Sequence, residues 1–364
     1  MWQFFSQKSV TFAQPKIYVM KPFSKQFLLF QFLLLVPLVT LSQNDGTLRI
    51  AFWNLENFFD TSVDSTRSYN EYTESGAQHW TKKRFYAKRN NLYKTILALS
   101  EGRALGVLGV AEVENETVLA SLFNATPLRR FGYRIVHYES PDRRGIDVAL
   151  VYDISRLKLL SSRPIAVRDP GNARFRTRDI LYVRLAASDG DTLHVFVNHW
   201  PSRYGGEAET IRLRCIAAST LRKVVDSIAC CAASPPKIII MGDLNDTPED
   251  KSVASVLDAK PPSFGQNDGF CLVNLFRQND KKGFEGTLKH EYTWQVFDHI
   301  IISNALIDSK NGLRYKKSSA QIFHAAFLFE EDKTRGGVKL HRTFVGPRYF
   351  GGYSDHLPVF IDLE

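Results

Sequence analysis

The sequence predicts one α/β domain over about residues 45–364, with β-sheets inside and helices outside. Apolar runs of strand length recur along the whole chain, and amphipathic stretches of helical length stand between some of them. The composition is that of a globular protein, with 44% hydrophobic and 23% charged residues in a chain of 364. Because the chain shows neither an internal repeat nor a low-complexity linker, we expect a single sandwich domain.

Strands are predicted wherever a short apolar run alternates with polar residues or is rich in β-branched residues. Such runs have the length of buried or half-buried strands, and most of them end next to a polar residue. In chain order the predicted strands cover residues 48–53, 104–111, 146–152, 180–186, 193–198, 237–242, 298–303 and 357–363.

Two longer stretches between these strands carry apolar residues at helical spacing. Residues 87–100 bring Leu92, Ile96 and Leu99 to one face, and residues 208–229 place a longer set of aliphatic residues on another. Each stretch has one apolar face, so we expect each helix to lie on the outside of a sheet.

The first 42 residues differ from the rest and are interpreted as a secretory signal peptide. They hold four lysines and no acidic residue, followed by an apolar run at residues 27–41 and small polar residues. This order of charged, apolar and small residues is typical of an export signal. Gln31 and Pro37 interrupt the run, which is short for a membrane span, and an uncleaved anchor is the alternative. We expect an exported catalytic domain of residues 43–364, periplasmic or secreted.

Charge and cysteine content add weaker constraints. An internal Met20 would give a more typical start, so residues 1–19 are interpreted as an extension of the signal. Removal of residues 1–42 takes away four lysines, so the net charge falls from +9 to +5, which favours a polyanionic partner. The four cysteines have neither zinc-finger spacing nor the density of a disulfide-built miniprotein.

Polar residues stand at the ends of the predicted strands. Placing charges beside a core strand costs free energy unless they are paired or bind a metal, so these placements need a common explanation. A shared site at one end of the sheets supplies it. The residues are Asn54, Glu56, Glu112, Asn198, His199, Asp243, Asn245, Asp298, Ser354, Asp355 and His356.

The chemistry of this set favours a hard divalent cation. Carboxylate and amide oxygens suit Mg²⁺, Mn²⁺ or Ca²⁺ better than a structural zinc ion, and no cysteine is among them. A bound cation relieves repulsion between carboxylates and can stabilise charge on a phosphoryl group. Taken alone, Asp243 and Asn245 could form only a turn, His199 could be a structural histidine and Glu56 a surface residue.

The order of these short motifs resembles the endonuclease/exonuclease/phosphatase superfamily, which includes DNase I. The motifs are Asn-x-Glu, a strand-terminal Glu, Asn-His, Gly-Asp-x-Asn, a strand-initial Asp and Ser-Asp-His, spread over residues 47–364. Each is weakly specific, but six in this order are strong together. "RRGIDVALVYD" and "GGYSDHLPV" look most like exported bacterial members. The resemblance implies a four-layer αββα sandwich of two mixed β-sheets packed face to face, with helices outside.

The resemblance also implies a metal centre. The cation would be Mg²⁺, or Mn²⁺ or Ca²⁺ in its place, because hard oxygen sites overlap in selectivity. Its implied ligands are Glu112, Asn54 and Glu56, with Asp355 at or next to the metal.

The same resemblance implies catalytic roles for five residues. Asp243 would orient or deprotonate the attacking water, and Asn245 would contact the phosphate. His356, oriented by Asp298, would hydrogen-bond the scissile phosphate. His199 matches the position at which DNase I-like members carry a histidine that helps the leaving group.

Two further polar residues stand near these motifs. His299 should point to the face of its strand opposite to Asp298, and it is predicted to be structural. Asp147, at the start of the predicted strand 146–152, is a secondary candidate that could reach the site or brace a neighbouring arginine.

Arginines supply candidate contacts to a substrate phosphate. In "ARFRTRD", Arg174, Arg176 and Arg178 would share one face if the segment were extended, and the arginine fork suits phosphate oxygens. Arg144 and Arg203 stand close to motif residues in the sequence and are further candidates.

These features predict a secreted, divalent-metal-dependent phosphodiesterase that hydrolyses nucleic acid, with a DNA endonuclease favoured. Residues 80–89 mix basic and aromatic side chains as nucleic-acid contacts do, although a solvated helix face is the alternative. A phosphatase or a phospholipase C-like enzyme of the sphingomyelinase or inositol phosphatase type is a second hypothesis. A non-catalytic nucleic-acid-binding module is the third. We expect a monomer without a stable protein partner.

Overall fold

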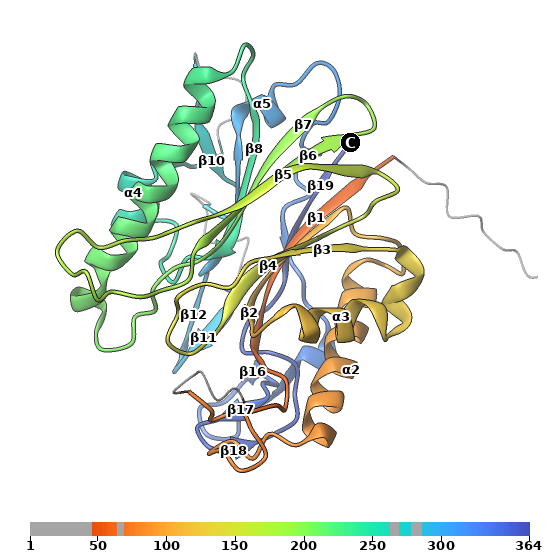
Figure 1. Ribbon diagram of the computed structural model, residues 1–364, viewed down its shortest axis with the longest axis vertical. Coiled ribbons are helices and arrows are strands. Elements are labelled where there is room, and N and C mark those ends of the chain that lie inside the picture. Colours follow the sequence, from red (N-terminus) through yellow and green to blue (C-terminus); the bar gives the residue numbers. More distant parts are fainter. Residues whose placement is uncertain (1–45, 64–68, 263–268, 278–285) are drawn as a thin grey trace, which may run out of the picture. The chain divides into compact units, whose positions relative to one another are not determined.

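The computed structural model describes residues 46–63, 69–262, 269–277 and 286–364 (Figure 1). The predicted signal peptide, residues 1–42, lies outside the described residues. Among the described helices, none combines the length and the apolar character needed to cross a bilayer. All four cysteines are free thiols, so the fold is held together by packing and hydrogen bonds rather than by disulfides.

Six strands form the first sheet. In order across the sheet they are β14 (Gln321–Ile322), β19 (Val359–Leu363), β1 (Leu48–Phe58), β2 (Val107–Val113), β4 (Asp147–Tyr152) and β3 (Arg134–His137). β1 and β2 run parallel and the other pairs are antiparallel, which makes the sheet mixed. The last strand of the chain therefore lies beside the first described one.

Seven strands form the second sheet. In order they are β5 (Leu157–Ile165), β6 (Ile180–Ala187), β7 (Thr192–His199), β8 (Lys237–Asp243), β13 (Asp298–Ser303), β10 (Leu272–Asn274) and β9 (Ala259–Lys260). β7 pairs with β8 in parallel and β10 pairs with β9 in parallel, so this sheet is mixed as well.

The two sheets pack face to face. Ile50 and Phe52 of the first sheet and Val195 of the second belong to one buried apolar cluster between them. A Cβ atom at Gly109 would lie 2.5 Å from Sδ of Met241 in the opposite sheet, so a side chain there would displace the Met241 side chain from the core between the sheets.

Helices cover the two outer faces, as Figure 1 shows, with α4 (Glu207–Cys231) on one side and α2 (Lys82–Leu99) and α3 (Glu116–Asn124) on the other. Leu92 and Ile96 of α2 pack on the outer face of the first sheet, and α4 packs on the second. The αββα sandwich is therefore confirmed. α2 begins earlier than predicted because the Thr81 side chain accepts a hydrogen bond from the backbone N–H of Arg84, a typical N-cap.

All eight predicted strands are present, and the sequence missed only shorter or exposed ones. β5 was missed because most of its residues are exposed at the sheet edge, so its apolar pattern is weak. The remaining elements are the short α-helix α5 (Asn304–Ile307), the 3₁₀ helices η2 (Pro127–Phe131) and η4 (Ala326–Leu328), and the π-helix η3 (Ser252–Val256). Three hairpins complete the fold: β11 (Leu288–His290) with β12 (Thr293–Gln295), β15 (Phe329–Glu331) with β16 (Val338–Leu340), and β17 (Phe344–Val345) with β18 (Arg348–Tyr349).

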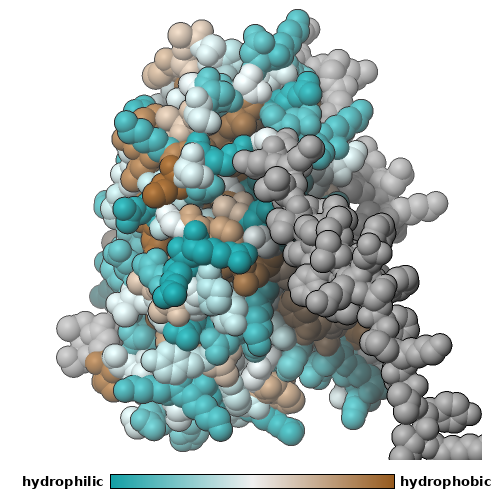
Figure 2. All heavy atoms as spheres, turned by 90° about the vertical axis from the view of Figure 1, so that its right-hand side faces the viewer, coloured by the Kyte–Doolittle hydropathy of each residue, from teal (hydrophilic) through white to brown (hydrophobic). Residues whose placement is uncertain are grey.

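Figure 2 shows one face of the molecule, on which hydrophilic residues predominate and hydrophobic ones are scattered among them. Such a surface is ordinary for a globular domain, and scattered apolar residues need no special explanation.

Candidate active site

The register of the strands brings the polar residues to one end of both sheets. In the second sheet His199 and Asp298 both lie opposite Asp243, on the parallel strand β7 and the antiparallel strand β13. In the first sheet β1 and β2 run parallel, so Asn54 and Glu112 reach the same edge. Asn54 Nδ2 donates a 3.0 Å hydrogen bond to Asp243 Oδ2, which joins the two edges.

Asp243 lies at the centre of this group. His356 Nε2 is 3.6 Å and His199 Nε2 is 3.7 Å from Asp243 Oδ2. Burial raises the pKa of Asp243 to about 7; His356 opposes this shift and Asp298 adds to it. A carboxyl group with this pKa gains and loses protons near neutral pH, as a general base must.

His356 is held by a carboxylate on its other side. Its Nδ1 is 2.7 Å from Asp298 Oδ2, and Trp53 Nε1 donates to its backbone carbonyl. Burial opposes a positive charge on the imidazole, but Asp298 and Asp243 outweigh it and raise the pKa of His356 well above its ordinary value. His356 is therefore a cation at neutral pH, which suits contact with a phosphate oxygen.

His199 approaches Asp243 from another strand and carries no charge at neutral pH. Burial lowers the pKa of His199 well below its ordinary value, and the positive charge of Arg178 adds to the effect. Its Nε2 lies 3.9 Å from Glu112 Oε1, and its buried Nδ1 has no hydrogen-bond partner among the described residues. The site thus combines one charged and one neutral imidazole.

Two site residues sit on backbone that non-glycine residues seldom adopt. Glu112 has a φ of 59° and lies at a register shift between β2 and β4. Asn245 has a φ of 52°; its backbone N–H bonds to Asp243 Oδ1 and its side chain donates to the Trp200 carbonyl. Such positions cost about 1–3 kcal/mol each, and they cluster at functional sites, as β-bulges do. The register shift at Glu112 directs its carboxylate toward the imidazole of His199 on β7.

The oxygen atoms of this group fit a divalent cation. The carboxylate oxygens of Asp243 and Asp298 lie within 4.8 Å of one another and of a ring nitrogen of His356, whose protonated ring cannot itself be a ligand. Asp298 Oδ1 is buried without a hydrogen-bond partner in the described part of the chain, a position that a cation would stabilise. Glu112, with 13% of its side chain exposed, supplies a further carboxylate beside them. This donor set suits a hard cation.

A comparison with protein families agrees with this geometry. The family described as endonuclease/exonuclease/phosphatase matches residues 49–364. The chain belongs to this family. Its members are divalent-metal-dependent hydrolases of phosphoester bonds, and this protein is therefore an enzyme of that class.

Solved structures of similar fold cover nearly the whole domain. A humanized D. rerio TDP2 has 16% identity and a TM-score of 0.51, with 88% of this chain and 99% of TDP2 covered. The mannosyl-6-phosphatase of Bacteroides thetaiotaomicron VPI-5482 has 14% identity and a TM-score of 0.53, with 87% and 99% covered. ANGEL2, a 2′,3′-cyclic phosphatase, has 15% identity and a TM-score of 0.53, with 88% and 96% covered. At these identities the similarity shows the fold. A search of the curated proteins gave no match.

Glu56, predicted as a metal ligand of the family site, has different partners. Its Oε1 accepts from Arg342 Nε at 3.1 Å and its Oε2 from the backbone N–H of Thr343 at 2.7 Å, with Lys88 Nζ at 3.6 Å. Both oxygens of this buried side chain are engaged by these partners, and the role of Glu56 as a metal ligand stays a prediction. Asp355 pairs with Arg342 Nη2 at 2.7 Å and keeps 28% of its side chain exposed, so its place near the metal stays a prediction.

The arginines predicted on one extended face do not share it. Arg174 and Arg176 are exposed whereas Arg178 is buried, because the segment forms turns and coil rather than a strand. Arg178 donates to the carbonyls of His199 and Trp200, at 3.2 and 2.6 Å. Its guanidinium therefore holds the end of β7 and does not face a substrate.

Arg203 and Arg144 also differ from each other. Arg203 Nε donates to the Asn245 carbonyl at 2.9 Å, and its Nη2 lies 2.6 Å from Asp250, so it braces the loop after β8. Arg144 Nη2 lies 3.6 Å from Glu112 Oε2, with 38% of its side chain exposed. Arg144 therefore remains a candidate for phosphate contact.

The sequence places Lys88 in a basic and aromatic stretch that fits either a nucleic-acid contact or a solvated helix face, and it gives no sign of the role of Arg342. Lys88 is fully buried, and its Nζ donates to Thr343 Oγ1 and to the Tyr353 carbonyl, at 2.6 Å each. Trp80 of the same stretch is buried as well. No local pattern marks these contacts, because they join residues more than 250 positions apart.

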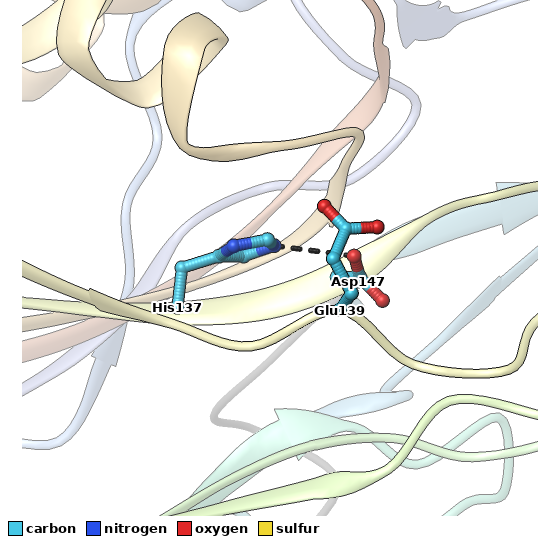
Figure 3. Close-up of side chains that lie close together, drawn as sticks. All are labelled: His137, Glu139 and Asp147. Carbon is cyan, nitrogen blue, oxygen red and sulfur yellow. Dashed lines mark hydrogen bonds and ion pairs between the residues drawn. The ribbon is translucent and has the colours of Figure 1, made fainter. Parts of the chain in front are cut away.

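A second group of titratable residues lies at the base of the loop that carries Arg144. Figure 3 shows the His137 ring directed at Asp147, with Glu139 beside them. His137 Nε2 is 3.1 Å from Asp147 Oδ2, while Asp147 Oδ1 accepts from the backbone N–H of Ser140 at 2.9 Å. Asp147, a secondary candidate in the sequence, therefore ties the two stems of this loop together.

Proposed function

We propose that this protein is an exported, cation-dependent phosphodiesterase that cleaves nucleic acid internally, with DNA as its substrate. The observation that carries the proposal is the pair of imidazoles around Asp243, of which one is charged and one is neutral. Hydrolysis of a phosphodiester needs a base for water, positive charge on the phosphoryl oxygens and a proton donor for the leaving alkoxide. The centre has a group for each task.

Each residue has a role that its geometry supports. Asp243, with a pKa of about 7, accepts a proton from the attacking water. His356 donates from Nε2 to a phosphoryl oxygen, while Asp298 holds the ring and stabilises its charge. Asn245, anchored on the Trp200 carbonyl, fixes the loop that begins after Asp243. A divalent cation, when bound, stabilises the negative charge that develops on the phosphoryl oxygens.

His199 is assigned to the leaving group. A proton that Asp243 takes from water reaches His199 only once the two groups close from the present 3.7 Å between Nε2 and Asp243 Oδ2 to hydrogen-bond distance, and His199 then gives it to the departing alkoxide. A neutral imidazole is required for this relay, since a permanently charged one could not accept the proton.

Three observations support nucleic acid and export. The net charge of +5 without residues 1–42 favours a polyanion. A D. rerio TDP2 of similar fold, at 18% identity and a TM-score of 0.51, has been solved with a single-strand DNA product. Residues 1–42 have the composition of an export signal.

The test is incubation of the purified protein lacking residues 1–42 with supercoiled plasmid and Mg²⁺ or Mn²⁺, with EDTA and the Asp243→Asn variant as controls. We expect metal-dependent nicking that the variant does not show. A folded protein that leaves both plasmid and RNA intact with either cation would refute the nucleic-acid proposal.

A phosphatase acting on small phosphomonoesters is the second candidate. It is supported by the similar fold of the Bacteroides thetaiotaomicron mannosyl-6-phosphatase. Release of inorganic phosphate from mannose 6-phosphate, with an intact plasmid in the parallel reaction, would favour this candidate over the first.

A further inference from the structure

Arg342 has a firmly held backbone next to the catalytic centre. The N–H of His341 bonds to the Leu328 carbonyl at 2.9 Å, and the N–H of Tyr353 bonds to the His341 carbonyl at 2.6 Å. On the other side of Arg342, the N–H of Thr343 bonds to Glu56 at 2.7 Å. Hydrogen bonds therefore hold the backbone on both sides of Arg342, and its side chain extends from a fixed position.

One edge of the Arg342 guanidinium is occupied and another part is accessible. Nε bonds to Glu56 at 3.1 Å and Nη2 pairs with Asp355 at 2.7 Å, yet 40% of the side chain is exposed. Asp355 chiefly raises the pKa of Arg342 against the effect of burial, and Glu56 and Glu112 add to it. Glu56, which Arg342 contacts, is next to Asn57, whose backbone N–H bonds to Glu112 Oε2 at 2.9 Å, so the charged guanidinium lies beside the segment that meets Glu112.

Arg144 reaches Glu112 from a different loop. Its Nη2 lies 3.6 Å from Glu112 Oε2 and also bonds to Asn57 Oδ1. Its side chain is 38% exposed, close to the value for Arg342. Arg144 bonds to Asn57 and Arg342 bonds to the adjacent Glu56, so two partly exposed arginines from separate loops meet at the segment that contacts Glu112.

These two arginines differ from the others that touch the site. Arg178 is buried against backbone carbonyls, and Arg203 has only 18% of its side chain exposed, against 40% for Arg342 and 38% for Arg144. The centre itself is rich in carboxylates, which repel a phosphate. Exposed guanidinium groups beside it offset this repulsion and can offer two parallel N–H donors to phosphate oxygens.

We propose that Arg342 and Arg144 form a phosphate-binding subsite beside Glu112, in which Arg342 contacts the non-bridging oxygens of the substrate phosphate. The subsite rests on the phosphoester hydrolase activity of the centre and not on the choice of nucleic acid as substrate. It adds a binding residue, Arg342, outside the motifs that mark the family.

The test measures binding of inorganic phosphate by isothermal titration in the presence of Mg²⁺, for the wild type, Arg342→Lys and Arg342→Ala. The matched control is Arg348→Gln, an exposed arginine of the same segment that stacks on Phe350. We expect Arg342→Lys to weaken phosphate binding at least about 10-fold, because an ammonium group keeps the charge and loses the fork. Arg348→Gln should bind phosphate as the wild type does.

Arg342→Lys should keep a melting temperature close to that of the wild type, because its ammonium can still pair with Asp355 and Glu56. With any cleaved phosphoester, its KM should rise while kcat changes little, as expected for lost ground-state binding. Unchanged phosphate affinity in folded Arg342→Lys would overturn the subsite, whatever Arg342→Ala does. If phosphate binding is lost as expected but plasmid is not cut, the subsite stands and the nucleic-acid proposal fails.

Discussion

Several polar groups of the catalytic centre lack close hydrogen-bond partners, whereas those of Arg178 and His299, called the bracing set, have them. In the centre, the imidazole Nε2 atoms of His199 and His356 lie 3.6–3.9 Å from carboxylate oxygens, and Asp298 Oδ1 has no hydrogen-bond partner among the described residues. In the bracing set, Arg178 makes hydrogen bonds of 2.6–3.2 Å, and both nitrogens of His299 are bonded at 2.9–3.0 Å. Unsatisfied groups are available to a cation or substrate, whereas satisfied ones hold the chain in place.

The largest expected effect comes from Asp298→Asn in the centre. The asparagine carbonyl can still accept from His356 Nδ1, but the charge that stabilises the imidazolium is gone. We expect phosphoesterase kcat to fall about 10³-fold, while the free energy of unfolding changes by less than about 1 kcal/mol. Steady-state kinetics and urea unfolding test this, and a large loss of stability without loss of activity would place Asp298 in the bracing set.

Arg178→Ala is expected to show the opposite result, a large loss of stability rather than of activity. It removes the ion pair between Arg178 Nη1 and Asp142 Oδ2, which are 3.1 Å apart, and two hydrogen bonds to the end of β7, so the free energy of unfolding should fall by about 3 kcal/mol. Arg176→Ala is the matched control, because Arg176 is exposed two residues earlier and should change stability by less than about 0.5 kcal/mol. Equal urea midpoints for Arg178→Ala and Arg176→Ala would show that Arg178 stabilises the fold no more than an exposed arginine does.

His299 should make stability depend on pH without affecting chemistry. Burial lowers its pKa from 6.5 to about 4, so the unfolded chain binds a proton in this range before the folded one does. The stabilisation that follows from this shift is fully present above pH 6.5 and is lost as pH falls toward 4, so the free energy of unfolding falls by roughly 3 kcal/mol in all. Urea unfolding across this range should show a shallower pH dependence for His299→Gln than for the wild type. An unchanged slope would contradict the role of His299.

The smallest effect is stabilisation by the cation. If Mg²⁺ binds the centre, a concentration 100 times the dissociation constant should raise the free energy of unfolding by about 2.7 kcal/mol. Thermal unfolding with Mg²⁺ and with EDTA measures this, and Glu112→Gln should reduce the difference. The same stabilisation in Glu112→Gln would place the cation away from Glu112.

Local pattern was sufficient for the strands and for most of the central site. The buried strands that carry Asn54, Glu112, Asp243 and Asp298 are apolar runs followed or preceded by a polar residue, so they can be recognised one at a time. The expectation that His299 is structural is also met, because alternation along a strand sends neighbouring side chains to opposite faces.

Tertiary structure decided which charged residues stay partly exposed beside the centre and which are buried against one another. Glu56 meets Arg342 across 286 positions, and Lys88 meets Thr343 across 255, so no sequence window contains both partners. The sequence by itself determined the sandwich, the metal-binding chemistry and the histidine and aspartate residues at the strand ends, because these follow from periodicity and motif order. Whether an arginine is buried on carbonyls, as Arg178 is, or partly exposed beside Glu112, as Arg144 is, depends on how distant segments pack and compete for the same charge.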